Sequence, residues 1–374
     1  MSASSGPARP GAGQTAGAEG MAAPPPPPRS GRLLAPRGAL ALGLALVALA
    51  FVAGGASGAY PIAPAQLLGA LAHAVSGTPP DTPQQLVFLN IRLPRLLLAA
   101  AAGAGLALAG ALMQGLFRNP LADPGLVGIS SGAALAAGLT IVLGPAWFPA
   151  LPHALGSWTL MLTAFAGGLA VTGFIYRFAQ GPAGTHVALM LLAGVAVNAL
   201  AGAGLGYLNF MATDEQLRNI QFWLLGSLGG ARWSAVALVT AVVALCCAAA
   251  LAWARPLNAI ALGEAQAALL GVHVERTKRA AVLITALAVG AITATTGIIG
   301  FVGLVAPHWV RLLTGPDHRV VLPCSALLGA ALVLAADAVA RTVVQPAELP
   351  LGVLTAAIGG PMFLWMLRHF RGRV

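Results

Sequence analysis

The stretch LPRLLLAAAAGAGLALAGALMQGLFRNPLADPGLVGISSG, residues 93–132, decides the fold. Its first part, 93–115, is almost wholly apolar and long enough to cross a bilayer, which takes about 20 residues of helix. The chain then breaks for Arg118-Asn119-Pro120 and Asp123-Pro124 before small and apolar residues resume. Because each proline disfavours helix at the residue before it, the sequence predicts two membrane helices joined by a structured turn.

The composition extends this prediction to the whole chain. Of the 374 residues, 58% are hydrophobic and only 8% are charged, whereas an ordinary globular domain has about 25% charged residues. This little polar surface cannot cover the core of a soluble protein. We therefore predict that a lipid bilayer surrounds the chain. The sequence therefore predicts an all-α polytopic membrane protein.

Ten apolar segments are candidate transmembrane helices, of which the eighth is short. They lie at 38–56, 93–115, 125–145, 158–178, 187–209, 232–254, 280–299, 303–314, 321–341 and 351–368. An even number places both termini on one side, and arginine clusters before the first, after the sixth and after the tenth segment fall on that side. Both termini are therefore predicted to be cytoplasmic. These clusters account for the net charge of +10, so we expect no nucleic acid partner.

The domain organisation follows from the N-terminal composition. Residues 1–37 are rich in Pro, Gly and Ala and are predicted to be a disordered cytoplasmic tail, in which Met21 is an alternative start to Met1. Residues 38–374 form the predicted transmembrane domain. The run at 38–56 resembles a signal peptide, but its length favours an uncleaved first span.

Two features exclude other chemistry. Lys278 is the only lysine and is followed by Arg279, so the chain has no GxxxxGK[ST] phosphate loop. We therefore expect a protein that is not an enzyme and does not itself hydrolyse ATP. Cys246, Cys247 and Cys324 lie in apolar runs and are predicted to be small buried hydrophobes, with no disulfide or metal site.

Small residues recur at helical spacing in three places: 102–105, 128–133 and 297–303. In lipid, helices associate through close backbone approach, so these patterns predict tightly packed helix faces.

Four arginines fall on the outer side of this topology, against the usual bias: Arg92, Arg95, Arg218 and Arg341. Exposed cations on that side require a reason.

Several long motifs occur in order along the chain. They are IRLPR (91–95), GALMQGLFRNPLADPGLVGISSGAALA (110–136), LNAIALGEAQAALLGV (257–272), GIIGFVGLVAPHWVRLLTGPDHRVVLP (297–323) and PAELPLGVLTAAIGGPMFLW (346–365). From about residue 40 to the C-terminus, the sequence resembles the FecCD family. These proteins are the membrane permease subunits of ABC importers for ferric siderophores, heme and cobalamin.

The resemblance implies the type II ABC importer permease fold and a set of partners. The expected assembly is a homodimer of ten-helix permeases with two ATPase subunits and a periplasmic binding protein, in the bacterial inner membrane. No permanently bound cofactor is expected, and heme or another iron chelate is the expected cargo.

The resemblance also gives the outer arginines a role. Arg92, Arg95 and Arg341 match positions that dock acidic groups of the binding protein, and a guanidinium pairs well with carboxylates. The alternatives are that Arg341 pairs with Asp337 one helical turn back, and that Arg92 and Arg95 bind lipid phosphate.

The cytoplasmic stretch 257–272 resembles the family's coupling loop, which contacts the ATPase. It is predicted to form two short helices broken at Gly263, and the expected coupling residues are Leu257, Gly263, Glu264, Leu269, Leu270 and Gly271. A plain solvated connector is the alternative, but it would leave Ile260, Leu262, Leu269 and Leu270 as exposed apolar surface without a partner.

Other matches concern the pathway. Thr185, His186 and Ala188 match the cytoplasmic gate, although Ala188 departs from the small hydroxyl residue expected there. Asn198 either faces the pathway or bonds a neighbouring helix. His308 follows Pro307 and is expected to pack or cap at a helix start rather than ligate heme.

The segments 214–230 and 308–319 resemble heme-type permeases more than siderophore-type permeases. Arg218 is a candidate partner for the heme propionates, unless it pairs with Asp214 or Glu215. The favoured function is therefore the permease of a heme importer, with ferric siderophore or cobalamin import as the alternative. A secondary transporter is a remote alternative, because Asp337 is the only acid well inside a predicted span.

Overall fold

The structure is a computed structural model and describes residues 33–370, apart from 59, 78–79, 81, 151–153, 183 and 345–346, together with residues 2 and 6. The predicted disordered tail, with Arg29 and Arg32, lies almost wholly outside the described residues, as do Arg371 and Arg373. Only its last residues are described, and helix α1 already begins at Pro36.

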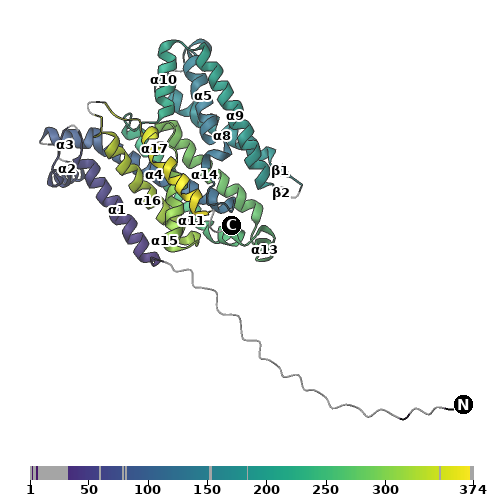
Figure 1. Cartoon of the computed structure of the whole chain (residues 1–374). Helices are drawn as coiled ribbons and strands as arrows, with labels where there is room; N and C mark the ends of the chain where they lie inside the picture. Colours follow the sequence, from purple (N-terminus) through teal and green to yellow (C-terminus); the bar gives the residue numbers. More distant parts are fainter. Residues whose placement is uncertain are drawn as a thin grey trace. The chain divides into compact units, whose positions relative to one another are not determined.

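The described part is a bundle of helices with one two-stranded hairpin (Figure 1). Its elements are α1 (Pro36–Ala56), α2 (Pro64–Ser76), α3 (Pro83–Val87), the π-helical η1 (Phe88–Arg92), α4 (Leu93–Leu116), the 3-10 helix η2 (Pro124–Val127), α5 (Ile129–Val142), α6 (Gly144–Trp147), α8 (Trp158–Phe178), β1 (Gln180–Gly181), β2 (Gly184–Thr185), α9 (Val187–Met211), α10 (Asp214–Leu225), α11 (Trp233–Ala252), α12 (Ala254–Ala261), α13 (Glu264–Leu269), α14 (Val274–Thr296), α15 (Val302–Thr314), α16 (His318–Ala340) and α17 (Leu351–Phe370).

The transmembrane prediction is confirmed as an all-α polytopic fold. Within the described residues, 8 helices are long and apolar enough to span a membrane. The remaining two predicted spans are the shorter helices α5 and α15. The expected continuous helix over 125–145 is wrong, because Gly128 takes the left-handed conformation (φ +80°) and separates η2 from α5.

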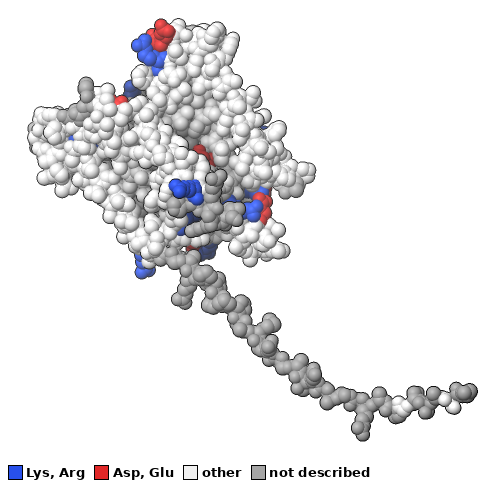
Figure 2. Space-filling model, viewed as in Figure 1, with Lys and Arg blue, Asp and Glu red and all other residues white. Residues whose placement is uncertain are grey.

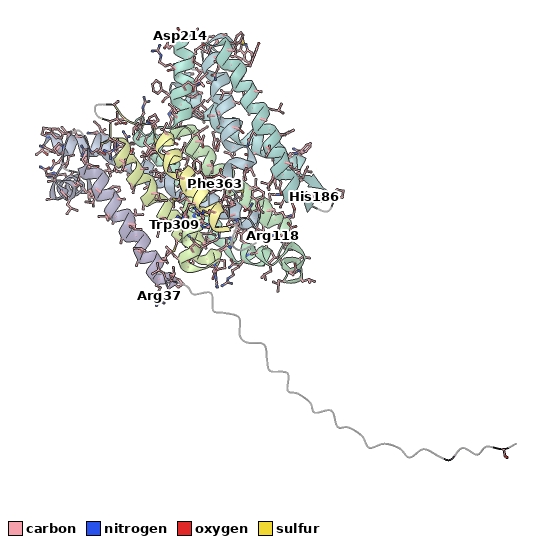
Figure 3. The ribbon with its side chains drawn as sticks, viewed as in Figure 1. Arg37, Arg118, His186, Asp214, Trp309 and Phe363 are labelled. Atoms are coloured by element: carbon pink, nitrogen blue, oxygen red, sulfur yellow. The ribbon has the colours of Figure 1, made fainter. Side chains whose placement is uncertain are left out.

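The surface fits a protein solvated by lipid. Over most of the visible face the side chains are uncharged, and a group of acidic and basic side chains stands at the tip of α10 (Figure 2). Asp214 lies at that tip, whereas Arg37, Arg118 and His186 lie toward the other end of the molecule (Figure 3). This arrangement agrees with the predicted sidedness, with Asp214 outside and the other three on the cytoplasmic side.

The predicted turn after α4 is present. Asn119 accepts a bond from the Leu121 N–H at 2.9 Å, and Asp123 caps η2 by accepting from the Gly125 N–H at 2.7 Å. Burial raises the pKa of the Asp123 carboxyl, and the bond from Gly125 partly offsets that rise. Local side-chain bonds of this kind are what Asx residues offer a turn in place of helix.

Helix α4 forms the centre of the bundle, packed against α16, α14, α11 and α15. Its small residues permit this, since a Cβ at Gly103 would lie 2.1 Å from the Gly329 carbonyl oxygen on α16. A Cβ at Gly110 would lie 1.7 Å from the same atom of Gly303 on α15. The predicted packing at 102–105 is therefore confirmed.

The two other small-residue patterns differ in outcome. Gly132 packs against Gly167 of α8, where an added Cβ would lie 2.6 Å from the carbonyl oxygen, so that prediction is confirmed. The prediction for 297–303 is wrong in part. Gly303 packs against α4, and Gly297, with φ +72° in the loop after α14, closely approaches the Trp223 carbonyl of α10, but Gly300 faces open space.

The predicted burial of the cysteines is confirmed for two of the three. All three are free, with Cys246 and Cys324 buried and Cys247 half-buried.

Candidate functional site

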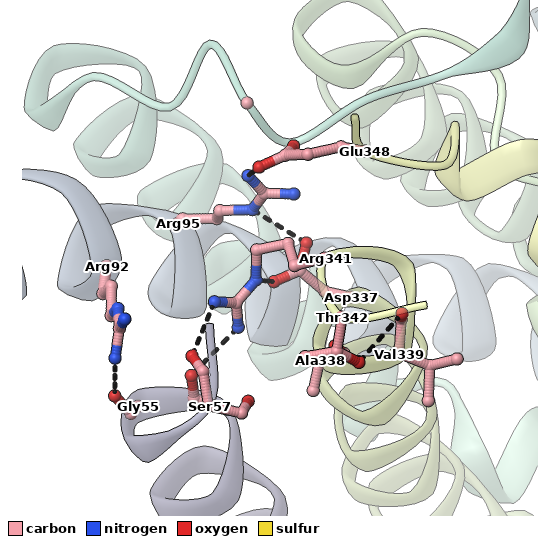
Figure 4. Close-up of polar contacts among 12 residues, drawn as sticks. Gly55, Ser57, Arg92, Arg95, Asp337, Ala338, Val339, Arg341, Thr342 and Glu348 are labelled. Atoms are coloured by element: carbon pink, nitrogen blue, oxygen red, sulfur yellow. Dashed lines mark hydrogen bonds and ion pairs between the residues drawn. The ribbon is translucent and has the colours of Figure 1, made fainter. Parts of the chain in front are cut away.

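The outer arginines form a compact ionic group, which we call the outer arginine cluster: Arg92, Arg95, Asp337, Arg341 and Glu348 (Figure 4). The Arg95 Nε lies 2.8 Å from Asp337 Oδ1, and its Nη1 lies 2.8 Å from Glu348 Oε2. The Arg341 Nε lies 3.0 Å from Asp337 Oδ2. Asp337 therefore gives one oxygen to each of two guanidinium groups.

The same cluster caps the end of helix α1. Arg92 donates to the Gly55 carbonyl at 2.7 Å and also to Tyr60, and Arg341 donates to the carbonyls of Gly54 at 2.9 Å and Ser57 at 3.1 Å. The last carbonyls of a helix lack partners within it, and cations are favoured at that end of the helix dipole. These arginines thus donate hydrogen bonds to carbonyl groups of α1 with which lipid tails could form none.

The expectation of four exposed outer arginines is wrong for three of them. Arg92 and Arg95 are buried, and so is the Arg341 side chain. The alternative that Arg341 pairs with Asp337 is confirmed.

Arg218 differs from the other three. It is exposed on α10, and within the described part of the chain it forms no ion pair, so the alternative pairing with Asp214 or Glu215 is not observed. Thr213 caps the start of α10: its hydroxyl accepts from the Gln216 N–H, while Gln216 Oε1 accepts from the Thr213 N–H. This capping box fixes a helix that presents Arg218 to solvent.

The cytoplasmic loop 257–272 has the two predicted short helices, α12 and α13, broken at Gly263. Gly263 has φ +126° and Gly271 φ +79°, conformations that favour glycine. Leu262, Leu269 and Leu270 are exposed, Leu269 to 89%.

Two residues of this loop point inward instead. Leu257 and Ile260 are fully buried, so Leu257 belongs to the core, and the expectation that Ile260 would be exposed is wrong. The amphipathic helix α12 packs against α4, α14 and α16 with this face.

The predicted gate residues lie on and just after a hairpin, in which β1 and β2 pair Gln180 with Thr185 and Gly181 with Gly184. We call the segment from Ala179 to His186 the gate hairpin; the His186 N–H closes it on the Ala179 carbonyl at 2.9 Å. Thr185 is buried, whereas His186 and Ala188 are exposed.

The gate hairpin is bonded to its surroundings through a set of side chains that we call the gate network: Tyr176, Thr185, Glu264, Glu275 and Lys278. Lys278 Nζ lies 2.7 Å from Glu264 Oε2 and 2.7 Å from the Thr185 carbonyl oxygen. Glu275 accepts the Thr185 N–H at 3.0 Å, the Thr185 hydroxyl, and the Tyr176 hydroxyl at 2.7 Å. Two predicted sites, Glu264 of the coupling loop and Thr185 of the gate, therefore meet.

Sequence reasoning did not identify Tyr176, Glu275 or Lys278 as site residues. One signal was available for Lys278, because it is the single lysine among twenty basic residues.

A second polar group joins the coupling loop to α16. Asn258 of α12 donates to Asp317 Oδ1 at 2.7 Å and accepts the His318 N–H at 2.9 Å. Burial alone would raise the pKa of Asp317, but bonds from Arg319 and Asn258 outweigh it and lower the pKa to about 2. Asp317 is thus held as a carboxylate at the start of α16.

The remaining predicted residues have structural partners. Asn198 is half-buried, accepts from the Ser131 hydroxyl at 2.5 Å and donates to the Gly125 carbonyl at 3.3 Å, which favours the helix-bonding alternative. His308 is buried within α15, which begins at Val302, so the expected position at a helix start is wrong.

Comparisons with known proteins agree with this architecture. The model of the FecCD transport family matches residues 45–369. The hemin transport system permease protein HmuU of Yersinia pestis is 48% identical over 285 residues, which is 76% of this chain and 84% of that protein. The cobalamin import system permease protein BtuC of Halobacterium salinarum is 44% identical over 289 residues, 77% of this chain and 75% of that protein.

A solved structure has the same fold. It is a metal-chelate type ABC transporter in an inward-facing conformation, with a TM-score of 0.76, 31% identity, and coverage of 88% of this chain and 98% of its own. The family match spans nearly all the described helices. The chain therefore belongs to the FecCD transport family and is an ABC importer permease, a multi-pass protein of the bacterial inner membrane.

Proposed function

We propose that this permease carries heme across the inner membrane as part of an ATP-driven importer. The observation that carries the proposal is the 48% identity with a hemin permease over 285 residues. A cobalamin permease at 44% identity makes cobalamin the second candidate cargo. Heme is the transported substrate here, not a resident cofactor.

Arg218 supports heme over cobalamin. It is an exposed guanidinium on the outer side, with no acid in ion-pair distance among the described residues. Heme carries two carboxylates, and a guanidinium fork pairs with a carboxylate through two parallel hydrogen bonds.

The energy for transport comes from separate subunits. The chain has no GxxxxGK[ST] loop, and its coupling loop presents Leu262, Leu269 and Leu270 to the cytoplasmic side. Exposed apolar side chains of this kind favour a protein partner. Two ATPase subunits bind a homodimer of the permease at this surface.

The outer arginine cluster is the proposed seat of the periplasmic binding protein. Its accessible edge is the Arg95–Glu348 pair, since the Glu348 side chain is 47% exposed. Acidic groups of the binding protein replace Glu348 at Arg95, while Arg92 and Arg341 hold the end of α1 beneath them.

Asp337 argues against the secondary-transporter alternative. Both its carboxylate oxygens are bonded to arginines, at 2.8 Å and 3.0 Å. A carboxylate neutralised in this way does not offer the ion or proton site that such a transporter needs at mid-membrane.

The test is uptake by proteoliposomes that contain the permease, the ATPase and the binding protein. We expect ATP-dependent hemin uptake that excess cobalamin or ferric siderophore does not inhibit. Arg218→Ala should lower hemin uptake at limiting hemin and leave binding-protein affinity unchanged. Arg232→Ala, which removes another exposed arginine on the outer side, is the control. Transport of cobalamin but not hemin would overturn the choice of cargo, and uptake without ATP would overturn the class.

A further inference from the structure

Lys278 lies between two elements that do not bond each other. It belongs to α14, while one of its partners, Glu264, begins helix α13 and the other, the Thr185 carbonyl, belongs to the gate hairpin. Within the part of the chain that the structure describes, no hydrogen bond joins α13 to the gate hairpin directly. Among the described residues, the Lys278 ammonium group bonds to both elements.

We propose that Lys278 is a positioning residue that locks the gate hairpin to the coupling helix α13. A displacement of Glu264 frees the ammonium group and thereby loosens the hairpin. This inference rests on the proposed function, in that an ATPase seated on the coupling loop is what moves α13.

The burial of Lys278 explains why the lock responds to Glu264. The Lys278 side chain is only 5% exposed. An ammonium group in such a place needs a carboxylate partner, because a buried charge without one is costly. Lys278 therefore cannot remain where it is when Glu264 moves away.

Glu275 provides the second position for the ammonium. It lies one turn before Lys278 on α14, a spacing that places both side chains on one helix face. In the structure Glu275 instead accepts both the N–H and the hydroxyl of Thr185. When Lys278 turns to Glu275, it leaves the Thr185 carbonyl and competes for the oxygens that hold the rest of that residue.

The backbone of the hairpin is shaped for this contact. Gly184 has φ +104°, and a Cβ there would lie 3.1 Å from Glu275 Oε2. Glycine at this position lets the strand approach the carboxylate closely. The hairpin is thus held at Thr185 by Glu275 and Lys278 together.

The accessible end of the lock is Glu264. Its side chain is 41% exposed, and it begins the short helix whose other end is Leu269, 89% exposed. A partner that binds the exposed leucines can therefore shift Glu264, whereas Lys278 is out of its reach.

The experiment measures amide hydrogen exchange of the gate hairpin in the full-length permease, in nanodiscs and without any ATPase. Glu264→Gln should raise exchange at 184–186 by about threefold to tenfold, and Lys278→Met by about tenfold or more. Arg279→Met, which removes the neighbouring exposed cation, should leave exchange unchanged and is the matched control.

The double variant decides between a lock and two independent effects. If Lys278 carries the connection, adding Glu264→Gln to Lys278→Met should change hairpin exchange by less than about twofold. An undiminished effect of Glu264→Gln in that background, or no effect of Glu264→Gln alone, would overturn the proposal. If Lys278→Met does not insert, Lys278→Leu replaces it, because leucine likewise lacks the ammonium group that bonds Thr185 and Glu264.

A separate arm distinguishes this inference from the proposed function. With the ATPase and binding protein added, Lys278→Met should keep ATP hydrolysis within about twofold and lose hemin uptake at least about tenfold. If no ATPase binds the wild-type permease, the proposed function fails while the exchange result on the permease alone stands. If the ATPase binds but the effects of Glu264→Gln and Lys278→Met on hairpin exchange simply add in the double variant, only the proposal of a lock at Lys278 is overturned.

Discussion

The outer arginine cluster and the gate network both bond elements that are far apart in the sequence, but the acids at their centres, Asp337 and Glu264, are exposed to water to very different extents. Asp337 is 1% exposed and shared by two arginines. Glu264 is 41% exposed and serves a single lysine. The cluster has more cations than acids, whereas the network has two acids, Glu264 and Glu275, for one lysine.

This difference indicates different uses of buried charge. Asp337 is buried, so its removal would leave a buried guanidinium group without a carboxylate. The outer cluster should therefore behave as a fixed structural unit. In the gate network the exposed acid can leave, and a second acid is within reach of the lysine. The outer end is therefore the more rigid of the two, and the cytoplasmic end is the one suited to movement.

The largest effect should come from Asp337→Asn. This change leaves the buried Arg341 without a carboxylate and Arg95 with only the half-exposed Glu348, and breaking a buried pair in this way costs about 3–5 kcal/mol. We expect a large loss of thermal stability and of assembled protein, measured by thermal unfolding in detergent with size-exclusion readout.

The comparator is Glu264→Gln in the gate network. The Glu264 carboxylate is 41% exposed, and Lys278 can turn to Glu275 when the pair is lost, so the unfolding midpoint should stay close to that of the wild type. Equal losses of stability in the two variants would mean that the exposure of the acid to water does not decide the cost of removing its charge.

The next effect concerns the helix contact that carries the outer cluster. Gly103→Val places side-chain atoms where a Cβ alone would lie 2.1 Å from the Gly329 carbonyl, and such overpacking typically costs about 1–3 kcal/mol. We expect a lower unfolding temperature and loss of transport together. Gly173→Val is the control, since that glycine faces open space on α8. A stable Gly103→Val protein would mean that α4 and α16 can separate without disturbing the cluster.

Local signals in the sequence sufficed for most of the fold. The turn after α4 follows from Pro120, Pro124 and the short side chains of Asn119 and Asp123, all within a few residues. Helix α2 was not predicted, although Pro64 at its first position and Gly77 in the left-handed conformation at its end are ordinary helix signals. The spans were predictable because apolar length is itself a local property.

The sites were predictable only where the contact is local. The Arg341–Asp337 pair is an i, i+4 contact and could be stated as an alternative. The Arg95–Asp337 pair joins residues 242 positions apart, so nothing in the sequence revealed that Arg95 is buried. The bond from Lys278 to Thr185, 93 positions away, was invisible for the same reason.

A smaller effect tests the exposed edge of the outer cluster. Glu348→Gln removes a half-exposed carboxylate, so stability should fall by only about 0–1 kcal/mol. Because the Arg95 Nη1 can then meet acids of the binding protein while its Nε stays on Asp337, docking affinity should rise by up to about tenfold, or 1.4 kcal/mol. Glu215→Gln on α10 is the control for charge alone. Unchanged affinity, measured by biolayer interferometry, would confine the cluster to its structural role.

The smallest effect is a pH dependence at the Asn258–Asp317 contact between α12 and α16. It shows whether the charge of Asp317 contributes to stability, as the charge of Asp337 is expected to do, or contributes little, as expected for Glu264. The folded-state pKa of Asp317, about 2, lies below the ordinary value for aspartate of about 3.9. Its carboxylate therefore stabilises the protein fully above the unfolded pKa, and that contribution is lost as pH falls toward 2. Asp317→Asn should lower the unfolding midpoint slightly at pH 7. The difference in midpoint between the variant and the wild type should become smaller as the pH falls from 5 to 3. A difference that stays constant with pH would mean that Asp317 acts only as a neutral helix cap, and that its charge links α12 to α16 no more than an asparagine would.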